Sequence, residues 1–231
     1  MFQNQYGTPS RVGVRPTVAL SQAFLTQAFL YMFLGLLVTT VVGVFAAGLA
    51  TSTLETLYVP AIVGQLVLAL VLSFGIRRMP ATLGMLLFFV YSATMGLAIG
   101  MVLQVYQPGS VLAAGASATA VFGAAAFYGA VTKRDLTAIG GFVFMALIGL
   151  IVASVVNLFV GWSTLSFLIS VAGVGIFTVL TAWDVQRIQR GDMAAWAGSM
   201  EKGAVMAAFH LYLDYINLFF FLLRLMGNQR N

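Results

Sequence analysis

The stretch VMAAFHLYLDYINLFFFLLRLM, residues 205–226, decides the fold. It is long enough to cross a bilayer as a helix, because about 20 apolar residues are sufficient. With an advance of about 100° per helical residue, its strongly polar side chains share one stripe about 80° wide: His210, Asp214, Asn217 and Arg224. An ionisable carboxyl group at membrane depth is costly and usually faces a partner or a water-filled cavity. We therefore expect this helix to lie at the centre of a bundle or beside a polar cavity.

The stripe also has a simpler interpretation, in which its side chains only join helices by hydrogen bonds. That interpretation suits His210 and Asn217. It suits Asp214 less well, because an asparagine would form such bonds without the cost of an ionisable group.

The composition indicates an integral membrane protein. Of the 231 residues, 61% are hydrophobic and 7% are charged, whereas soluble domains carry about a quarter charged residues. The net charge of +5 is modest, so we expect it to set orientation in the lipid bilayer rather than to bind nucleic acid. The chain contains no cysteine, which excludes disulfides and thiol chemistry.

Seven apolar segments predict seven transmembrane helices in an all-α fold. They cover residues 24–49, 59–76, 81–103, 111–131, 138–160, 165–183 and 205–226. We expect a single transmembrane domain over residues 21–231, preceded by a polar cytoplasmic segment, residues 1–20. That segment lacks the apolar core and cleavage site of a signal peptide.

Basic residues predict that the N-terminus is cytoplasmic. They occur before the first segment and in every second connection: Arg11, Arg15, Arg77, Arg78, Lys133, Arg134, Arg187, Arg190 and Lys202. The alternate connections, 50–58, 104–110 and 161–164, contain none. Seven full crossings would place the C-terminus outside together with Arg230. A re-entrant last segment, or a short tail carried across, would account for that exception.

A second aspartate, Asp184, closes the apolar run 171–183. It can be read as a simple helix-end ion pair with Arg187, and Arg77 and Arg78 are candidate partners on the same side of the membrane. If Asp184 and Asp214 approach one another, they share protons and titrate as a pair. The hypothesis is then a pH-dependent charge at the cytoplasmic mouth of a polar path, which attracts a cation when ionised and releases its arginine when protonated.

Two local patterns predict helix contacts and ends. Gly96 and Gly100 form a GxxxG step that permits close helix packing, although the pattern is common by chance. Asp135 or Thr137 is placed to cap the fifth helix.

Several stretches together resemble the Bax inhibitor (transmembrane Bax-inhibitor-motif) family. They are residues 132–136 (TKRDL), 149–157 (GLIVASVVN), 181–188 (TAWDVQRI), 211–219 (LYLDYINLF) and 223–227 (LRLMG). The resemblance implies six helices around a central seventh and a pH-sensitive calcium leak controlled by a di-aspartyl pair. Carried over by motif, the pair is Asp184 and Asp214, and the latch is Arg77, with Arg78 and Arg187 as alternates. Bacterial members resembling this chain lie in the cell (inner) membrane. Trp183 departs from the tyrosine common before the first aspartate.

The residues suit a permeant calcium ion better than a resident metal. Calcium prefers six to eight oxygen ligands, and Asp184, Asp214 and Asn217 with nearby carbonyls offer fewer. Weak, transient binding at the two aspartates is compatible with conduction. We expect no cofactor and no enzymatic activity; the expected partners are the lipid bilayer, calcium as the permeant ion, and protons.

Other functions remain open. Buried aspartates also serve proton-coupled transporters, and a regulatory partner of a membrane protease is a further alternative. An intramembrane aspartyl protease is less favoured, because Leu-Tyr-Leu precedes Asp214 where that class has Gly-x-Gly, and no Pro-Ala-Leu motif occurs. A serine protease dyad of Ser117 and His210 lacks a second motif.

Overall fold

The computed structural model describes residues 18–230. The predicted N-terminal segment, with Arg11 and Arg15, lies outside these residues except for 18–20, which begin the first helix. The helices in the described part are α1 (Val18–Ala47), α2 (Thr51–Gly75), the 3₁₀ turn η1 (Ile76–Arg78), α3 (Ala81–Val105), α4 (Pro108–Val131), α5 (Thr137–Val160), α6 (Ser163–Arg190), α7 (Asp192–Ala197) and α8 (Met200–Met226). Seven of them, all but η1 and α7, are long and apolar enough to cross a membrane.

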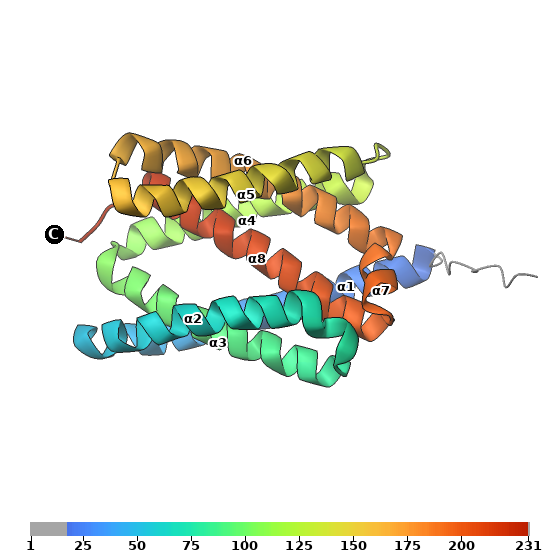
Figure 1. The fold of residues 1–231 in the computed structure, drawn as a ribbon, viewed down its shortest axis with the longest axis horizontal. Coiled ribbons are helices and arrows are strands. Elements are labelled where there is room, and N and C mark those ends of the chain that lie inside the picture. The colour runs from blue at the N-terminus through green and yellow to red at the C-terminus, as the bar shows by residue number, and fades with distance from the viewer. Residues whose placement is uncertain (1–17, 231) are drawn as a thin grey trace, which may run out of the picture.

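Helix α8 lies between two groups of three helices. The first group is α1, α2 and α3, the second is α4, α5 and α6, and α8 crosses between them in Figure 1 and contacts α1, α3, α4 and α6. Its most apolar window is 61% buried, whereas no other span exceeds 39%. The predicted central position of the last helix is therefore confirmed.

Tyr212 fastens α8 to the first group. Its hydroxyl lies 2.6 Å from Thr39 Oγ1 on α1, and Thr39 donates to the carbonyl of Ser92 on α3 at 2.8 Å. The Tyr212 ring packs edge-on against Phe88 and Tyr91, both on α3. Such edge-to-face pairs add stability beyond that of the buried area. Together with the hydrogen bonds, they hold α8 against α1 and α3.

Glycines allow α1 and α3 to pack closely. A Cβ atom at Gly96 would lie 2.6 Å from Val42 Cβ, and one at Gly100 would lie 2.6 Å from Ala46 Cβ. Both distances are too short for any residue larger than glycine. The predicted close approach at the GxxxG step is confirmed, and its partner is α1.

Several helix ends differ from the predicted spans, and those of α2, α6 and α8 bear on the site. Helix α2 starts at Thr51 rather than 59, so Pro60, which is favoured at a helix start, lies inside the helix. Helix α6 continues past 183 to Arg190, and α8 starts at Met200 rather than 205. Polar residues at these ends lowered the hydropathy although the backbone stays helical. Asp184 consequently lies inside α6, not at its end.

The short helix α7 was not predicted. Gly191 and Gly198 flank it with φ values of 76° and 86°, a left-handed conformation that favours glycine. The two turns fold the connection from α6 back against the start of α8, where Ser199 caps α8 by accepting a hydrogen bond from the Lys202 amide.

The last helix is one continuous helix that is long enough to cross a membrane. Its 27 residues span about 40 Å at 1.5 Å per residue. The tail beyond it is tied to the connection between α3 and α4: the Gln107 amide donates to the Asn228 carbonyl at 3.0 Å, and the Arg230 amide donates to the Val105 carbonyl at 2.8 Å. This connection lies at the end of the bundle opposite η1 and α7 (Figure 1).

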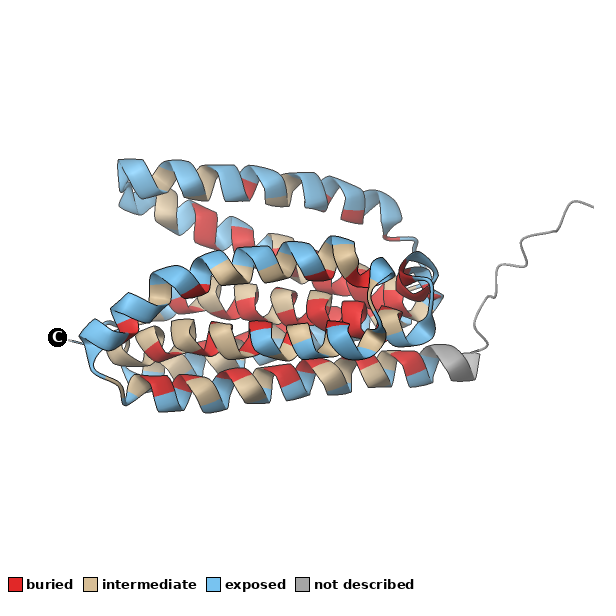
Figure 2. Ribbon diagram, turned by 60° about the horizontal axis from the view of Figure 1, so that its bottom comes forward, coloured by how far each residue is buried: buried red, intermediate tan, exposed pale blue. Residues whose placement is uncertain are grey.

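The outward faces of the peripheral helices are apolar and exposed. Figure 2 shows exposed residues on the outside of the bundle and buried ones concentrated towards its middle. Only 11% of the apolar window of α5 and 17% of that of α2 is buried. These faces meet lipid in an integral membrane protein, as the sequence predicts.

Candidate functional site

Asp184 lies buried near the end of α6 that carries the basic connections. One of its oxygens, Oδ1, lies 3.2 Å from Arg187 Nη1, one turn later on the same helix. The other, Oδ2, lies 3.1 Å from His210 Nδ1 on α8. The Arg187 guanidinium also stacks on the Trp183 ring, 4.6 Å from its centroid. A buried carboxylate thus receives both a permanent positive charge and a titratable group.

Asp214 lies one helical turn beyond His210 on α8 and is also buried. Its Oδ2 is buried and has no hydrogen-bond partner among residues 18–230. Buried polar atoms are normally paired, so an orphaned carboxyl oxygen marks a place where a proton, water or cation can bind.

One long cavity joins these groups. Its volume is about 1350 Å³, and its walls come from α2, α3, α5, α6 and α8. The polar stripe of α8 lines it throughout: His210, Asp214, Asn217 and Arg224. Asp184 and Arg187 line it from α6. The structure therefore places both aspartates on one cavity wall, and we call this space the α8 groove.

The other polar residues of the stripe contribute differently. Asn217 donates its side-chain amide to the Leu213 carbonyl of its own helix at 2.8 Å, so it does not join α8 to a neighbour. Arg224 is exposed at the far end of α8. His210 contacts Asp184, and the side chains of the described residues show no hydrogen bond between it and Ser117.

Arg77 is not the arginine that holds Asp184 in this structure. Its guanidinium lies over the Trp196 ring of α7, 5.6 Å from the centroid, and its carbonyl accepts a hydrogen bond from Lys202 Nζ at 3.0 Å. Arg187, the sequence-proposed alternate, makes the ion pair instead. The physical reason is the continuation of α6 beyond 183, which places Arg187 one turn from Asp184 on the same face.

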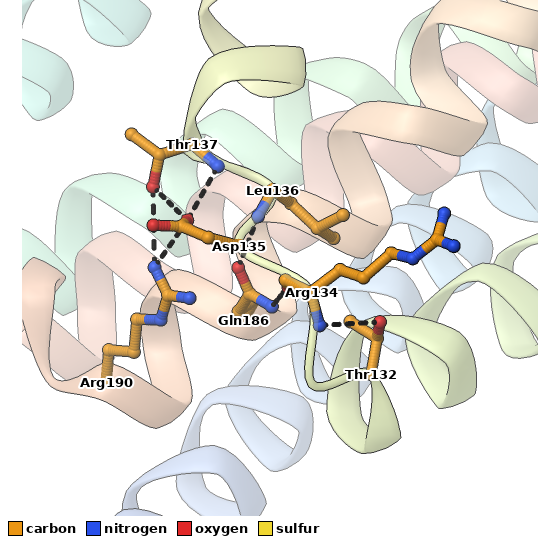
Figure 3. A network of polar contacts seen from close by, with 7 residues as sticks. All are labelled: Thr132, Arg134, Asp135, Leu136, Thr137, Gln186 and Arg190. Carbon is orange, nitrogen blue, oxygen red and sulfur yellow. Dashed lines mark hydrogen bonds and ion pairs between the residues drawn. The ribbon is translucent and has the colours of Figure 1, made fainter.

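A second polar network, shown in Figure 3, fixes the end of α6 next to this site. Gln186 is buried; its Oε1 accepts from the Leu136 amide at 2.9 Å, and its Nε2 donates to the Arg134 carbonyl at 2.7 Å. Sequence reasoning missed Gln186. The signal available was a long polar side chain inside the otherwise apolar end of α6, facing the connection 132–136.

Asp135 completes this network. Its Oδ1 accepts from the Thr137 hydroxyl and amide and from Arg190 Nη1, at 2.6, 2.9 and 2.8 Å. The predicted cap is not formed, because Leu136 is the N-cap residue of α5 and no side chain caps this helix; Asp135 lies one residue earlier and binds the Thr137 amide from there. The hydrogen bonds from Thr137, helped by Arg190, hold the pKa of Asp135 well below its usual range. The carboxylate therefore stays ionised throughout the physiological range, and the contact is lost only as the pH falls through that low pKa.

No preformed metal site is present in the described part of the chain. Among residues 18–230, no three His, Cys, Asp or Glu side chains converge. A cation in the α8 groove would meet the two aspartates and carbonyl or amide oxygens only, fewer ligands than calcium prefers.

Comparison with known proteins supports what the geometry suggests. Residues 21–231 match the family Bax1-I, inhibitor of apoptosis-promoting Bax1. The chain belongs to the Bax inhibitor family. It is 36% identical over 226 residues to the inner membrane protein YbhL of Escherichia coli (strain K12), covering 94% of this chain and 96% of YbhL.

Other bacterial relatives match this chain over a similar length. The uncharacterised protein RP147 of Rickettsia prowazekii is 38% identical over 220 residues, which cover 90% of each chain. A protein of Deinococcus radiodurans is 38% identical over 214 residues, covering 91% of this chain and 92% of its own. None of these relatives carries an enzyme name. The family and the seven apolar helices together establish an integral membrane protein of the Bax inhibitor type.

Proposed function

We propose that this Bax inhibitor family member is a pH-sensitive calcium leak channel of the bacterial cell (inner) membrane, gated at Asp184 and Asp214. The proposal rests on one observation above all: two buried carboxyl groups from different helices line the same groove, and only one of them has ionic partners. An unpartnered oxygen on Asp214 is available to a proton or a passing cation.

In this proposal, gating follows from competition between protons and two basic side chains for the carboxylate of Asp184. In the described conformation Arg187 and His210 occupy its two oxygens, which keeps positive charge at the cytoplasmic end of the α8 groove. Protonation of the aspartates weakens these contacts, and ionisation restores them. A change of pH therefore alters both the charge of the path and the contact between α6 and α8, two of the helices that line it.

Weak coordination supports conduction rather than storage. An ion must leave a site as readily as it enters, and the α8 groove offers two aspartates without a converging third acidic or histidine ligand in residues 18–230. Calcium is cargo in this scheme, and the protein needs no cofactor.

The test is calcium flux in reconstituted vesicles. Asp184→Asn and Asp214→Asn should each reduce flux or flatten its pH dependence, because each removes one titrating carboxyl group from the groove. Asp192→Asn, at an exposed aspartate of α7 outside the groove, is the matched control and should leave the pH profile unchanged. If both groove variants conduct with the wild-type pH profile, the di-aspartyl gate is wrong.

Proton-coupled transport is the second candidate, favoured by the orphaned Oδ2 of Asp214. A coupled transporter moves protons with its substrate, so calcium movement would acidify or alkalinise the vesicle lumen in a fixed ratio. A pH indicator trapped in the vesicles separates the two functions: a leak shows calcium flux without obligatory proton movement.

A further inference from the structure

A second cavity lies outside the α8 groove, at the basic end of the bundle. It has a volume of about 600 Å³ and is lined by Phe74, Arg77, Arg78 and Trp196. The two arginines belong to η1, the turn between two membrane spans, and Trp196 belongs to α7, which contacts that turn. The cavity therefore lies where the bundle leaves the membrane on the predicted cytoplasmic side.

Positive charge in this cavity is not compensated. Lys202 Nζ donates to the carbonyl of Arg77 at 3.0 Å, so a third basic residue contacts η1. In residues 18–230, no carboxylate lies within ion-pair distance of Arg77, Arg78 or Lys202, whereas Arg187 and Arg190 each pair with an aspartate. An anion bound here would meet donors that the protein leaves unused.

One wall of the cavity continues into the membrane-facing surface. Phe74, in the last turn of α2, is 73% exposed. The outward face of α2 above it carries further exposed apolar side chains: Val63, Leu66, Val67, Leu70 and Val71. A ligand with an anionic head and a hydrocarbon tail fits this arrangement, with the head on the arginines and the tail along α2.

Arg77 is preorganised for such a head group. Its guanidinium carbon lies over the Trp196 ring, 5.6 Å from the centroid, a cation–π contact that favours this position of the group. A planar guanidinium binds a phosphate through two parallel hydrogen bonds. Basic pockets at the cytoplasmic ends of transmembrane helices are suited to anionic lipid head groups.

We propose that this cavity binds the phosphate of an anionic phospholipid of the cytoplasmic leaflet, held by Arg77 and Arg78 with Trp196 as its wall. The lipid's acyl chain lies along α2 past Phe74. This site is separate from the α8 groove and does not depend on the calcium proposal.

Native mass spectrometry of the full-length protein tests the site. Phosphatidylglycerol and phosphatidylcholine with identical acyl chains are titrated onto the detergent-solubilised wild type, onto the double variant Arg77→Gln/Arg78→Gln, and onto Lys133→Gln/Arg134→Gln. The last removes the same charge from the neighbouring basic connection, where the Arg134 side chain points away from the polar network (Figure 3) and neither residue lines the cavity.

The wild type should retain phosphatidylglycerol in preference to phosphatidylcholine. Loss of both arginines should weaken phosphatidylglycerol binding about thirtyfold, or roughly fivefold for each charge, whereas the control double variant keeps its preference. Trp196→Leu leaves the charge unchanged and removes the wall of the cavity, so it should also weaken the preference; it serves as the test if the arginine variant does not fold.

Three results would overturn the proposal. The first is a wild type without preference for phosphatidylglycerol. The second is an equal loss in the control double variant, which would show that the total positive charge attracts lipid without a site. The third is displacement of the lipid by inorganic phosphate as effective as that by short-chain phosphatidylglycerol, which would indicate a site for free phosphate.

Discussion

Asp184 divides its two carboxylate oxygens between two helices. Arg187 lies on the same helix, and His210 comes from α8. The first partner is always charged, and the second is charged only when protonated. The contact between α6 and α8 is therefore the one whose charge depends on pH, whereas the contact within α6 keeps its cation.

Replacing His210 by glutamine should make the pH dependence of calcium flux shallower. The variant keeps a polar side chain of similar size and removes the imidazole that contacts Asp184. Flux measured as a function of pH gives the slope. Asn217→Ala, on the same stripe and bonded only to its own helix, is the control and should keep the wild-type slope. An unchanged slope in the histidine variant would remove His210 from the sensor.

Comparing the leak of two arginine variants identifies which arginine acts as the latch on Asp184. Arg187→Ala should raise the leak at neutral pH, because it removes the ion pair with Asp184. Arg77→Ala should raise it less, since that guanidinium lies over Trp196. Flux at neutral pH in the two variants is the measurement. A leak raised only by Arg77→Ala would indicate that Arg77 replaces Arg187 in another conformation.

At the scale of single elements, the close packing of α1 on α3 depends on glycines, which have no side chain to separate the two helices. Gly96→Ala should lower stability by about 1–3 kcal/mol, the usual cost of overpacking. The new Cβ would meet the stiff Val42 side chain and, at 3.0 Å, the Thr39 carbonyl. Gly64→Ala in α2 is the control, because nothing lies within 4 Å of its Cβ position. The control should be neutral or stabilising, since alanine favours helix over glycine. Thermal unfolding in detergent measures both, and equal effects would contradict the packing argument.

One side chain, that of Gln186, hydrogen-bonds the end of α6 to the connection before α5. Gln186→Met keeps the volume but leaves the Leu136 amide and the Arg134 carbonyl without their partner. Each unsatisfied buried group costs about 1–3 kcal/mol, so the variant should unfold at lower temperature and exchange the Leu136 amide hydrogen faster. Gln229→Met, at an exposed position of the tail, should do neither. If the Leu136 amide hydrogen of Gln186→Met exchanges at the wild-type rate, the hydrogen bonds of Gln186 are not needed to hold this connection.

At the scale of the whole molecule, the bundle has a basic end and a far end. Arg77, Lys133 and Arg187 lie at the first, and the tail with Arg230 is bonded to the α3–α4 connection at the second. This arrangement favours a short tail carried across the membrane, rather than a re-entrant last segment, as the explanation of the exception to the charge rule.

Cysteine labelling tests this topology directly, because the native chain has none. A membrane-impermeant maleimide added to intact cells should label Gln229→Cys from outside. It should label Lys133→Cys only after the membrane is opened. The reverse pattern would invert the orientation, and labelling of both positions only in opened cells would return the last helix to a re-entrant path.

The lengths of the apolar segments and the polar stripe of the last one predict most of this architecture. Seven spans and a central last helix follow from apolar runs and from one polar stripe, because these are properties of single segments. The partner of Asp184 and the role of Gln186 do not, because they depend on where α6 ends and on what packs against that end. Polar residues such as Gln186 and Arg190 continue a helix beyond the point at which hydropathy falls, so the length of α6 could not be read from its composition.

The central position of α8 has a consequence for how the protein is made. A ribosome delivers the chain from its N-terminus, so the helix that joins the two groups is the last to enter the membrane. Until then, α1 and α3 can pair through their glycines, but Thr39, Phe88 and Tyr91 lack the Tyr212 side chain they finally contact. Assembly is thus completed by the last helix, and a chain interrupted before residue 200 lacks the helix that contacts both groups.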